Sequence, residues 1–346
     1  QKNDCHAFMI KKILLVLALL TPISIFAQKA SINGYVTDKS SRETLLSANV
    51  ALLETNRGTT TNTLGYFSLT NLEPGTYTIA CSYIGFELFR KTVTLSENET
   101  LRLDIELEPN IVATEEIVVT SERIIEAQKN IGTQDINTEL ITSLPKVFEA
   151  DVFRSIQLLP GVKAASDFSS GLYVRGGSPD QTLILLDRNT VYNPSHFFGF
   201  FSTFNPDAIK DVRLYKGGYP AEYGGRLSSV LTIYNKDGNR NRTEGTATLG
   251  MLASRVSIEG PYKKGSWMFS ARRSTLEPVL AALRSTSDNI PSSFYFLDFN
   301  GKVNFDATKN DKLSLAFYSG QDKVNFPFSD DAEFKLNYGN RTLSGN

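Results

Sequence analysis

Histidine and cysteine are scarce in this sequence, and their scarcity removes most routes to catalysis and metal binding. The 346 residues include two histidines and two cysteines, and only His196 and Cys81 lie beyond the N-terminal segment. A histidine-based metal site or catalytic triad would therefore depend on His196 alone. The Gly-x-Ser-x-Gly pattern of a nucleophile elbow does not surround Ser195. We expect no catalytic residues, no metal site, no cofactor and no disulfide framework, so the protein is not expected to be an enzyme.

An excess of charge of either sign is also lacking. Lys and Arg number 36 against 37 Asp and Glu, which gives a net charge of −1. The sequence therefore offers no basic field for a nucleic-acid partner. Tyr and Phe are plentiful, at 14 and 22, as is typical of strand-rich proteins, and the length suits two or three domains.

Long apolar runs are absent apart from one near the N-terminus. Met9 is followed by Ile10-Lys11-Lys12, an apolar run over 13–20 and compact residues up to Ala27. This order predicts a secretory signal peptide over 9–27 that is cut after Ala27. An N-terminal membrane anchor is the alternative, but the run is short for a span. Residues 1–8 would then be upstream read-through or a cloning scar.

Residues 28–109 contain short strand-like segments separated by turn signals, a spacing that predicts a β-sandwich. The segments are 30–37, 48–53, 59–61, 66–69, 75–83, 89–95 and 100–107. The stretches Asn33-Gly34-Tyr35-Val36, Thr63-Leu64-Gly65-Tyr66-Phe67 and Pro74-Gly75-Thr76-Tyr77 resemble the carboxypeptidase-regulatory-like module. That resemblance implies a β-sandwich over nearly all of this unit and implies no catalysis.

Residues 171–235 alternate short strands with paired glycines, which mark tight turns or close backbone approaches. Short strands end at Gly176-Gly177, Asp187 and Gly217-Gly218, and Gly224-Gly225-Arg226 precedes an alternating strand over 227–234. Asn205-Pro206-Asp207 is a helix-start signal, and a helical turn is expected over 207–210. Upstream, the spacing of Phe148, Val152, Ile156 and Leu159 predicts one buried helical face that ends before Pro160-Gly161.

The order of these motifs resembles the plug domain of TonB-dependent outer-membrane receptors. The matching stretches are Tyr173-Val174-Arg175-Gly176-Gly177, Leu185-Leu186-Asp187, Asn205-Pro206-Asp207-Ala208-Ile209, Lys216-Gly217-Gly218 and Ala221-Glu222-Tyr223-Gly224-Gly225-Arg226. The resemblance implies a plug domain over 122–238. One departure is visible, because Asp187-Arg188-Asn189-Thr190 stands where the family usually has Asp-Gly and a proline. This departure leaves the conformation of that hairpin tip open.

The linker over 110–121 contains Glu115-Glu116-Ile117-Val118-Val119-Thr120-Ser121, which is similar to the TonB box of these receptors. An extended, β-branched segment flanked by charge is suited to adding a strand to a partner's sheet. The resemblance implies that Glu116, Ile117, Val118, Val119 and Thr120 bind a TonB-type energy-transducing protein of the inner membrane. The alternative is that the segment forms the last strand of a neighbouring sheet.

Polar and aromatic residues of the plug are the remaining candidates for function. Arg175, Asp187, Lys216 and Arg226 stand beside tight turns, where they either pair with the barrel wall or are solvated strand ends. The stretch 192–204 is rich in aromatics, which are common binding anchors. Tyr192, His196, Phe197 and Phe198 are candidates for facing the ligand, and packing inside the plug is the alternative for all four.

Residues 239–346 show the alternation of a transmembrane β-barrel, and strands are expected at 246–258, 266–273, 297–305 and 313–319. Leu297, Phe299, Val303 and Phe305 should face outward, opposite an inner face of Asp298, Asn300, Lys302, Asn304 and Asp306. A soluble sheet would alternate in the same way. Short turns are expected at 259–265 and 307–311, and a longer external loop with a helical piece at 274–293. At about ten residues per spanning strand plus turns, residues 239–346 provide about five strands. A plugged transporter has roughly 22, so the barrel is expected to be truncated.

These observations together predict a mainly β protein: a β-sandwich, an α+β plug and the first strands of a transmembrane antiparallel barrel. The resemblance implies a receptor in the outer membrane of a Gram-negative bacterium, with the N-terminal domain in the periplasm. It would import a glycan, a siderophore or a similar ligand with inner-membrane energy. A surface lipoprotein is a further expected partner, because the arrangement resembles receptors of Bacteroidetes. The alternatives are a signal-transducing sensor and a surface-binding or adhesion protein.

Overall fold

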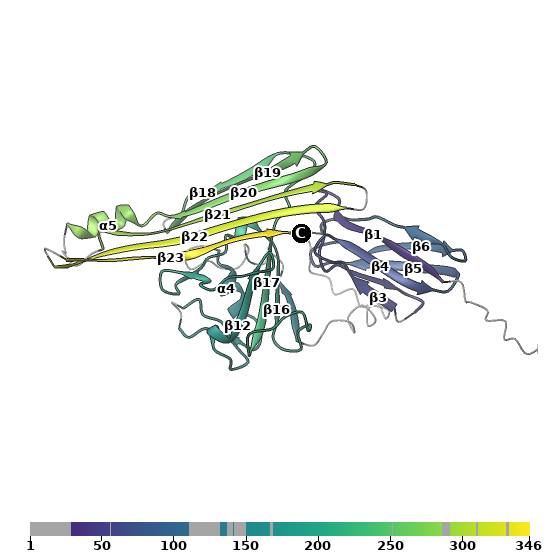
Figure 1. The fold of residues 1–346 in the computed structure, drawn as a ribbon, viewed down its shortest axis with the longest axis horizontal. Helices are drawn as coiled ribbons and strands as arrows, with labels where there is room; N and C mark the ends of the chain where they lie inside the picture. The colour runs from purple at the N-terminus through teal and green to yellow at the C-terminus, as the bar shows by residue number, and fades with distance from the viewer. Residues whose placement is uncertain are drawn as a thin grey trace, which may run out of the picture.

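The computed structural model describes most of the chain beyond the predicted signal peptide. The described residues are 29–55, 57–110, 132–136, 141, 150–166, 169–250, 252–285, 291–308, 311–329 and 332–346. They form three parts, which are a β-sandwich, the plug over 132–238 and a sheet of long strands (Figure 1). Within these residues no helix is both long and apolar enough to cross a membrane.

The first part consists of two four-stranded sheets packed face to face. One sheet has the order β4-β1-β7, with β8 also paired to β1, and the other has the order β3-β2-β5-β6. The strands are β1 (Ala30–Asp38), β2 (Asn49–Leu52), β3 (Arg57–Thr60), β4 (Tyr66–Leu72), β5 (Gly75–Ser82), β6 (Phe89–Leu95), β7 (Thr100–Arg102) and β8 (Ile105–Leu107). Apolar side chains from both sheets, including Ile32, Leu52, Ile79 and the free thiol of Cys81, fill the core. The predicted β-sandwich is confirmed.

Gly34 explains why the predicted strand over 100–107 divides in two. A Cβ atom at Gly34 would lie 1.9 Å from the carbonyl oxygen of Leu103, so only glycine allows the backbones to approach so closely. The Leu103 amide donates to the Asn33 carbonyl, and Asp104 accepts a hydrogen bond from the Tyr35 amide at 3.0 Å. These bonds hold the segment between β7 and β8 on β1.

The plug is built on a five-stranded mixed sheet of order β13-β12-β17-β16-β9, whose strands β12, β16 and β17 stand below the long strands in Figure 1. Its strands are β9 (Thr133–Ile136), β12 (Thr182–Leu186), β13 (Asn189–Thr190), β16 (Ile209–Tyr215) and β17 (Ser229–Asn235). Smaller elements complete it: β10 (Val162–Lys163), β11 (Tyr173–Val174), β14 (Ser195–His196), β15 (Phe201–Ser202), α4 (Val152–Gln157), η1 (Pro179–Gln181) and η2 (Pro206–Ala208).

Two predicted helical segments are present with different limits. Helix α4 begins after Asp151, whose side chain accepts from the Arg154 amide, and it ends at Gln157 instead of reaching Leu159. Its residues Val152 and Ile156 are buried in the plug core as expected, whereas Phe148 lies outside the described residues. The turn predicted over 207–210 lies at 206–208, because the strand β16 already begins at Ile209.

The hairpin tip that departs from the family pattern keeps the geometry of an Asp-Gly turn. Leu186 pairs with Asn189, so the loop has two residues, Asp187 at φ 44° and Arg188 at φ 71°. Positive φ at both positions is the signature of a type I′ turn, which favours glycine at the second position. Arg188 therefore adopts a backbone conformation in which a non-glycine residue is strained.

The third part is an antiparallel meander of six strands, β18 to β23, drawn in green to yellow in Figure 1. The strands are β18 (Glu244–Thr248), β19 (Ala253–Tyr262), β20 (Gly265–Ser274), β21 (Ser293–Asp306), β22 (Lys312–Ser329) and β23 (Ala332–Gly345). The prediction of a single strand over 246–258 is wrong, because this part of the chain forms two antiparallel strands, β18 and β19. The turn predicted over 259–265 is shorter, since β19 continues to Tyr262. Helix α5 (Glu277–Arg284) is the helical piece expected in the loop after β20.

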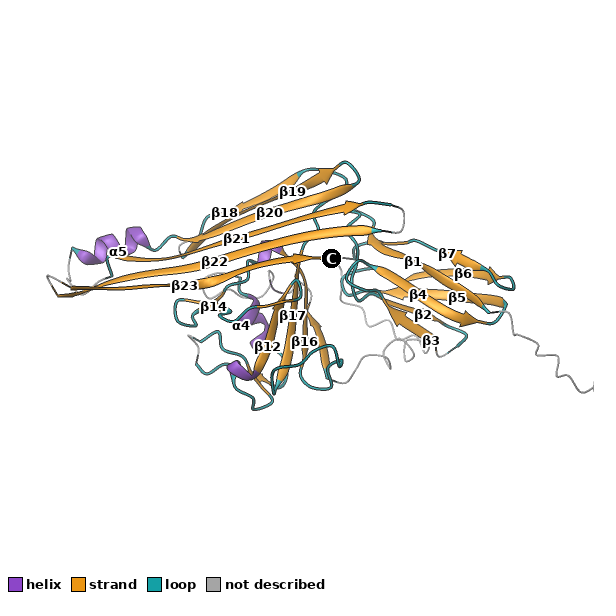
Figure 2. Ribbon diagram, viewed as in Figure 1, coloured by secondary structure: helices purple, strands orange, loops and turns teal. Residues whose placement is uncertain are grey.

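The two faces of this sheet differ as the alternation predicts. Asp298, Asn300 and Lys302 are buried on the side that faces the plug, whereas Val303 and Phe305 are 47% and 38% exposed on the other. Figure 2 shows the long strands lying over the plug, with the β-sandwich beyond one end of them. Tyr318 of β22 is packed in the plug core itself. An apolar outer face and a polar, plug-covered inner face are the arrangement of a plugged barrel.

Candidate functional site

The plug contacts the polar face of the six-stranded sheet through two buried clusters of charged side chains. One, the junction cluster, also includes residues of the β-sandwich and consists of Glu43, Thr44, Asp187, Lys210, Asn235, Asp237 and Lys302. The other, the histidine cluster, consists of His196, Arg272, Asp298, Tyr318 and Asp322. Both connect segments that lie far apart in the sequence.

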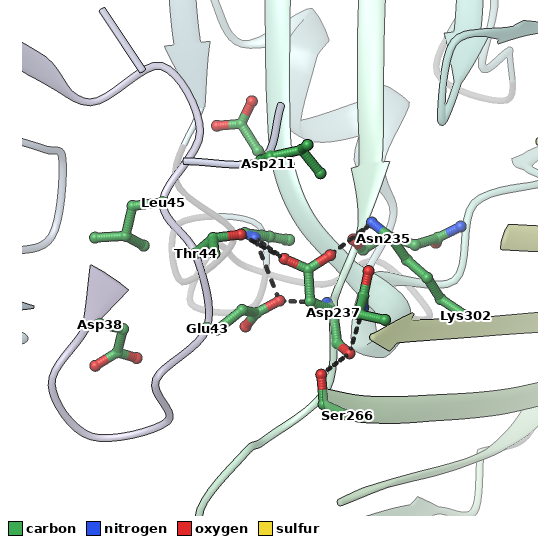
Figure 3. Close-up of polar contacts among 12 residues, drawn as sticks. Asp38, Glu43, Thr44, Leu45, Asp211, Asn235, Asp237, Ser266 and Lys302 are labelled. Carbon is green, nitrogen blue, oxygen red and sulfur yellow. Dashed lines mark hydrogen bonds and ion pairs between the residues drawn. The ribbon is translucent and has the colours of Figure 1, made fainter. Parts of the chain in front are cut away.

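Asp237 is the centre of the junction cluster and joins all three parts of the molecule (Figure 3). Its Oδ2 lies 2.5 Å from Nζ of Lys210 in the plug and accepts a hydrogen bond at 2.9 Å from the Thr44 hydroxyl of the β-sandwich. Its Oδ1 lies 2.8 Å from Nζ of Lys302 in β21. The two lysine side chains are at most 10% exposed, so these ion pairs are shielded from solvent.

The backbone around Asp237 is held by the sheet as well. Ser266 of β20 and Asn304 of β21 both donate to the Asp237 carbonyl, at 2.7 and 2.8 Å, and Ser266 is drawn beside it in Figure 3. Lys302 donates to the carbonyl of Asn235 at 3.0 Å. A Cβ atom at Gly238 would lie 2.3 Å from the Trp267 carbonyl oxygen, so glycine is required there. The segment that leaves the plug is therefore fixed onto the first long strands.

Glu43 brings a further carboxylate from the β-sandwich into the junction cluster. It accepts a hydrogen bond from the Asp237 amide and lies 3.5 Å from Nζ of Lys210. Burial raises the pKa of Glu43, and the attraction of Lys210 opposes this only in part. Burial would also raise the pKa of Asp237, but Lys210 and Lys302 outweigh it and hold that pKa well below its usual value. Glu43 is thus the carboxylate that takes up a proton more readily as the pH falls.

His196 lies between two carboxylates of the long strands. Its Nδ1 is 2.6 Å from Oδ2 of Asp322, its Nε2 is 2.9 Å from Oδ1 of Asp298, and the ring is 1% exposed. The imidazole stacks on Phe296 with 4.2 Å between the ring centroids. Burial alone would lower the pKa of His196, but the two carboxylates outweigh it and raise the pKa above its ordinary value. The charged imidazolium is therefore the favoured partner of these two aspartates.

Arg272 extends the histidine cluster across the sheet. Its Nε donates to Asp298 at 2.9 Å, and its Nη2 donates to the Ser202 carbonyl of the plug at 2.7 Å. Tyr318 donates through its hydroxyl to the same aspartate at 3.2 Å. The side chains of Arg272 and Asp298 are both 0% exposed. Removing Asp298 would leave the buried Arg272 guanidinium without its carboxylate partner.

The four candidates for facing the ligand separate into two pairs. Tyr192 and Phe198 are 80% and 67% exposed, as that role requires. The prediction is wrong for His196, which Asp298 and Asp322 hold in a buried contact. Phe197 is half-buried, with its ring centroid 4.2 Å from that of Phe294. Both residues pack against the long strands, whereas the alternative given above was packing inside the plug.

The glycine motifs of the plug come together at turns away from both clusters. Arg175 and Gly176 have φ of 47° and 87°, and a Cβ atom at Gly217 would lie 3.3 Å from the Arg175 guanidinium. A Cβ atom at Gly177 would collide with the side chain of Ser228 at 2.1 Å. The turn residues Gly218, Gly224, Gly225 and Arg226 are exposed.

Four polar residues were predicted beside the barrel wall. Among the residues that the structure describes, only Asp187 of these four forms an ion pair with a long strand. Asp187 lies 3.5 Å from Nζ of Lys302, and it accepts from the Asn235 side chain at 2.6 Å. Lys216 donates instead to the Pro160 carbonyl at 3.2 Å, within the plug. Arg175 and Arg226 are exposed, and in the described part of the chain neither forms an ion pair.

Several members of the clusters were not singled out from the sequence. Asp298 and Lys302 belong to the inward polar face that the alternation predicts, which is the signal that could have found them. Glu43, Lys210 and Asp237 carry no such signal, because their meeting depends on how the three parts are placed. The predicted signal peptide and the predicted box, Glu116–Thr120, lie outside the described residues. Within the described ranges no group of three or more His, Cys, Asp and Glu side chains could hold a metal ion.

Two family profiles match consecutive parts of the chain. The profile of the CarboxypepD_reg-like domain matches residues 32–119, and that of the TonB-dependent Receptor Plug Domain matches residues 126–229. The first range includes most of the predicted TonB box. The TonB-dependent transporter Oar of Myxococcus xanthus is 24% identical over 234 residues, which cover 64% of this chain and 22% of that protein. The chain thus spans about a fifth of the length of this relative.

Solved structures of outer-membrane receptors are also similar. A ferric enterobactin receptor (PfeA) of Pseudomonas aeruginosa superimposes with a TM-score of 0.41 at 18% identity, covering 60% of this chain and 35% of that one. The outer membrane transporter YddB of Escherichia coli gives 0.45 at 12% identity, covering 62% and 36%. Receptors with such a plug are outer-membrane proteins, with the plug and the N-terminal domain on the periplasmic side. The two profile matches follow one another in the expected order, so the chain contains a carboxypeptidase-regulatory-like domain followed by the plug domain of TonB-dependent receptors.

Proposed function

We propose that this protein imports a large or scarce ligand across the outer membrane with energy transduced by a TonB-type inner-membrane protein. The observation that carries the proposal is the seating of the plug, which is held on the polar face of the long strands by two buried charged clusters. A plug fixed in this way blocks passage at rest and must be moved for transport. The match to the plug profile and the similarity to a TonB-dependent transporter support transport over an enzymatic role.

The coupling segment is assigned to Glu116, Ile117, Val118, Val119 and Thr120. Strand addition depends on backbone hydrogen bonds, so an extended segment can pair with a partner's sheet edge through its N–H groups. The segment stands between the β-sandwich and the plug in the sequence, where a pulling force reaches both. Its similarity to the TonB box supports this role.

Ligand contact is assigned to Tyr192 and Phe198, whose rings project from the plug loop that also contains His196. Phe198 approaches Tyr338 of β23, with 6.2 Å between the ring centroids. Exposed aromatic rings beside a closed passage are suited to a ligand with flat or apolar surfaces. A glycan, a siderophore or a similar ligand fits this description, and a surface lipoprotein is a further candidate partner.

Opening requires the plug residues of both clusters to separate from the long strands. The junction cluster holds the segment that follows β17, and the histidine cluster holds the loop that contains His196. Force on the linker would reach the junction cluster first, because Glu43 and Thr44 belong to the β-sandwich that precedes the linker. The glycine motifs at Arg175–Gly177, Gly217-Gly218 and Gly224–Arg226 are assigned to the turns that keep the plug intact during this movement.

Substitution of Val118 tests the proposal in the full-length receptor. Proline removes a backbone donor and fixes φ, whereas alanine changes only the side chain. Val118→Pro should abolish energy-dependent uptake while ligand binding and outer-membrane abundance stay near normal, and Val118→Ala should have a mild effect. The measurements are uptake by energised and de-energised cells beside binding at the cell surface. Full uptake by the proline variant would show that this segment is not the coupling strand.

A further inference from the structure

A cavity of about 470 Å³ lies at the seam between the β-sandwich and the plug, beside the junction cluster. Its walls include Tyr83, Ile84 and Phe86 from the β-sandwich and Ile136 and Ile209 from the plug. The Tyr83 and Phe86 rings lie 5.5 Å apart and are tilted by 50°. The cavity therefore offers aromatic and aliphatic surface of a kind that binds part of a small molecule or a side chain.

Asp211 of β16 brings a buried carboxylate to the apolar side chains of this cavity. The residue is 5% exposed, and its Oδ1 accepts a hydrogen bond from the Tyr83 hydroxyl at 3.1 Å. Its Oδ2 is buried and has no hydrogen-bond partner among the described residues. The pairing of β16 with β17 is irregular between Ile209 and Asp211, and such bulges redirect side chains. Figure 3 shows the Asp211 carboxylate directed from the plug strand toward the β-sandwich.

The other charged groups around the cavity already have partners. Asp135 pairs with Arg213, Glu43 and Lys210 belong to the junction cluster, and Lys236 lies 3.5 Å from Glu259. Asp38 accepts from the side chains of Ser40 and Ser41. Asp211 is thus the carboxylate of the cavity with an oxygen left for a ligand, within the part of the chain that the structure describes.

We propose that this cavity is a binding site for an organic cation of the alkylguanidinium or alkylammonium class. Such a group would donate to Oδ2 of Asp211 and place its charge beside the faces of Tyr83 and Phe86, and aromatic faces attract cations. A single available carboxylate oxygen does not suit a metal ion, which needs several oxygen ligands. Anions are excluded by Asp211 itself, and a neutral ligand would leave its charge uncompensated. The cation is either a free small molecule or an Arg or Lys side chain of a periplasmic protein.

Protonation of Asp211 should control this binding. Burial, only partly offset by Arg213, raises the pKa of Asp211 to about 6. The charged or titratable groups that face it from the surrounding elements are Tyr83, Asp135, Arg213, Lys210, Tyr234, Glu43, Asp38 and Lys236. The carboxylate is therefore charged at pH 7.5 and neutral at pH 5, so the bound cation should be released as the pH falls through this range.

The test compares butylguanidinium with butylurea, which has nearly the same shape but no charge, on the complete chain in detergent. Calorimetric titration at pH 7.5 should detect butylguanidinium and not butylurea, and binding should weaken about tenfold or more at pH 5. Asp211→Asn should cause a similar loss, and Phe86→Leu a smaller one. Asp180→Asn, the same change on an exposed acid of the plug, should leave binding unaltered. Circular dichroism would confirm that each variant is folded.

Two further outcomes decide the proposal and the source of the cation. Equal binding of the two probes, or undiminished binding by a folded Asp211→Asn variant, would overturn the site. A Gly-Gly-Arg-Gly-Gly peptide that binds as well as butylguanidinium would identify a protein side chain as the occupant. Exclusion of that peptide, with butylguanidinium still bound, would identify a free small cation. None of these readouts depends on transport, so failure of the site would leave the proposed import function untouched.

Discussion

The imidazole of His196 lies 2.6 Å from the carboxylate of Asp322, although 126 residues separate them in the sequence. The contact joins a loop of the plug to the inner face of the strand β22. The carboxylate of Asp298 in β21 lies 2.9 Å from the other ring nitrogen, so one side chain of the plug connects two neighbouring strands. Asp322 also accepts a hydrogen bond from the backbone amide of Phe197 at 3.1 Å, which fixes the loop as well as the ring. The loop is therefore anchored by a charge that depends on pH.

The stabilisation from His196 should decrease as the pH rises. Its pKa is raised above the ordinary value of 6.5 in the folded protein, so its contribution is fully present below pH 6.5 and is lost as the pH passes the folded pKa. His196→Gln keeps the hydrogen-bonding capacity but has no charge. The melting temperatures of the complete chain and of this variant in detergent should differ at pH 6 and converge toward pH 9. A difference that stays constant with pH would contradict the charged state.

Loss of Lys302 should be far more costly than loss of an exposed lysine on the same sheet. Lys302→Met leaves Asp237 and Asp187 buried without this cation, which should lower the free energy of unfolding by about 3 kcal/mol. Lys335→Met provides the control, because Lys335 is 67% exposed in its pair with Glu333 and should change stability by less than about 0.5 kcal/mol. Chemical unfolding of both variants measures the difference.

A double variant separates the ion pair from packing. Lys302→Met combined with Asp237→Asn removes both charges, so it should be less destabilised than the sum of the two single variants. Strict additivity of the three free energies would show that Lys302 acts through packing alone.

The alternation of single strands revealed which way side chains face, but not which distant residues meet. The pattern over 297–305 placed Asp298 and Lys302 on the inner face, where the structure has them buried. It could not indicate that Lys302 meets Asp237, or that Glu43 reaches the same residue from 194 positions away. Such contacts follow from how the sandwich, the plug and the sheet are placed, which local periodicity does not contain. His196 illustrates the same limit: the aromatic residues beside it in the sequence are visible, whereas Asp298 and Asp322 are not its sequence neighbours.

Alanine at Gly34 should destabilise the β-sandwich strongly. The added Cβ would lie 1.9 Å from the Leu103 carbonyl oxygen, so β1 and the segment between β7 and β8 would have to separate. We expect a loss of about 2 kcal/mol or more in the free energy of unfolding. Gly301→Ala is the matched control, since its Cβ would have its nearest contact at 4.0 Å. Hydrogen exchange resolved by segment should show the loss confined to the β-sandwich, and protection equal to that of the parent chain would disprove the steric account.

Glycine at position 188 should stabilise the plug by relieving the hairpin tip. Arg188 has φ 71° at the second position of a two-residue type I′ turn, where glycine has no steric penalty. Arg188→Gly would restore the Asp-Gly sequence usual in the family, and we expect a gain of up to about 1 kcal/mol in the free energy of unfolding. Arg90→Gly makes the same chemical change on the exposed strand β6 and should instead cost about 1 kcal/mol, because glycine is unfavourable within a strand. Chemical unfolding of the two variants beside the parent chain would check these opposite signs. Destabilisation by both would mean that the Arg188 side chain contributes more than its backbone strain costs, and that this receptor's departure from Asp-Gly serves the plug.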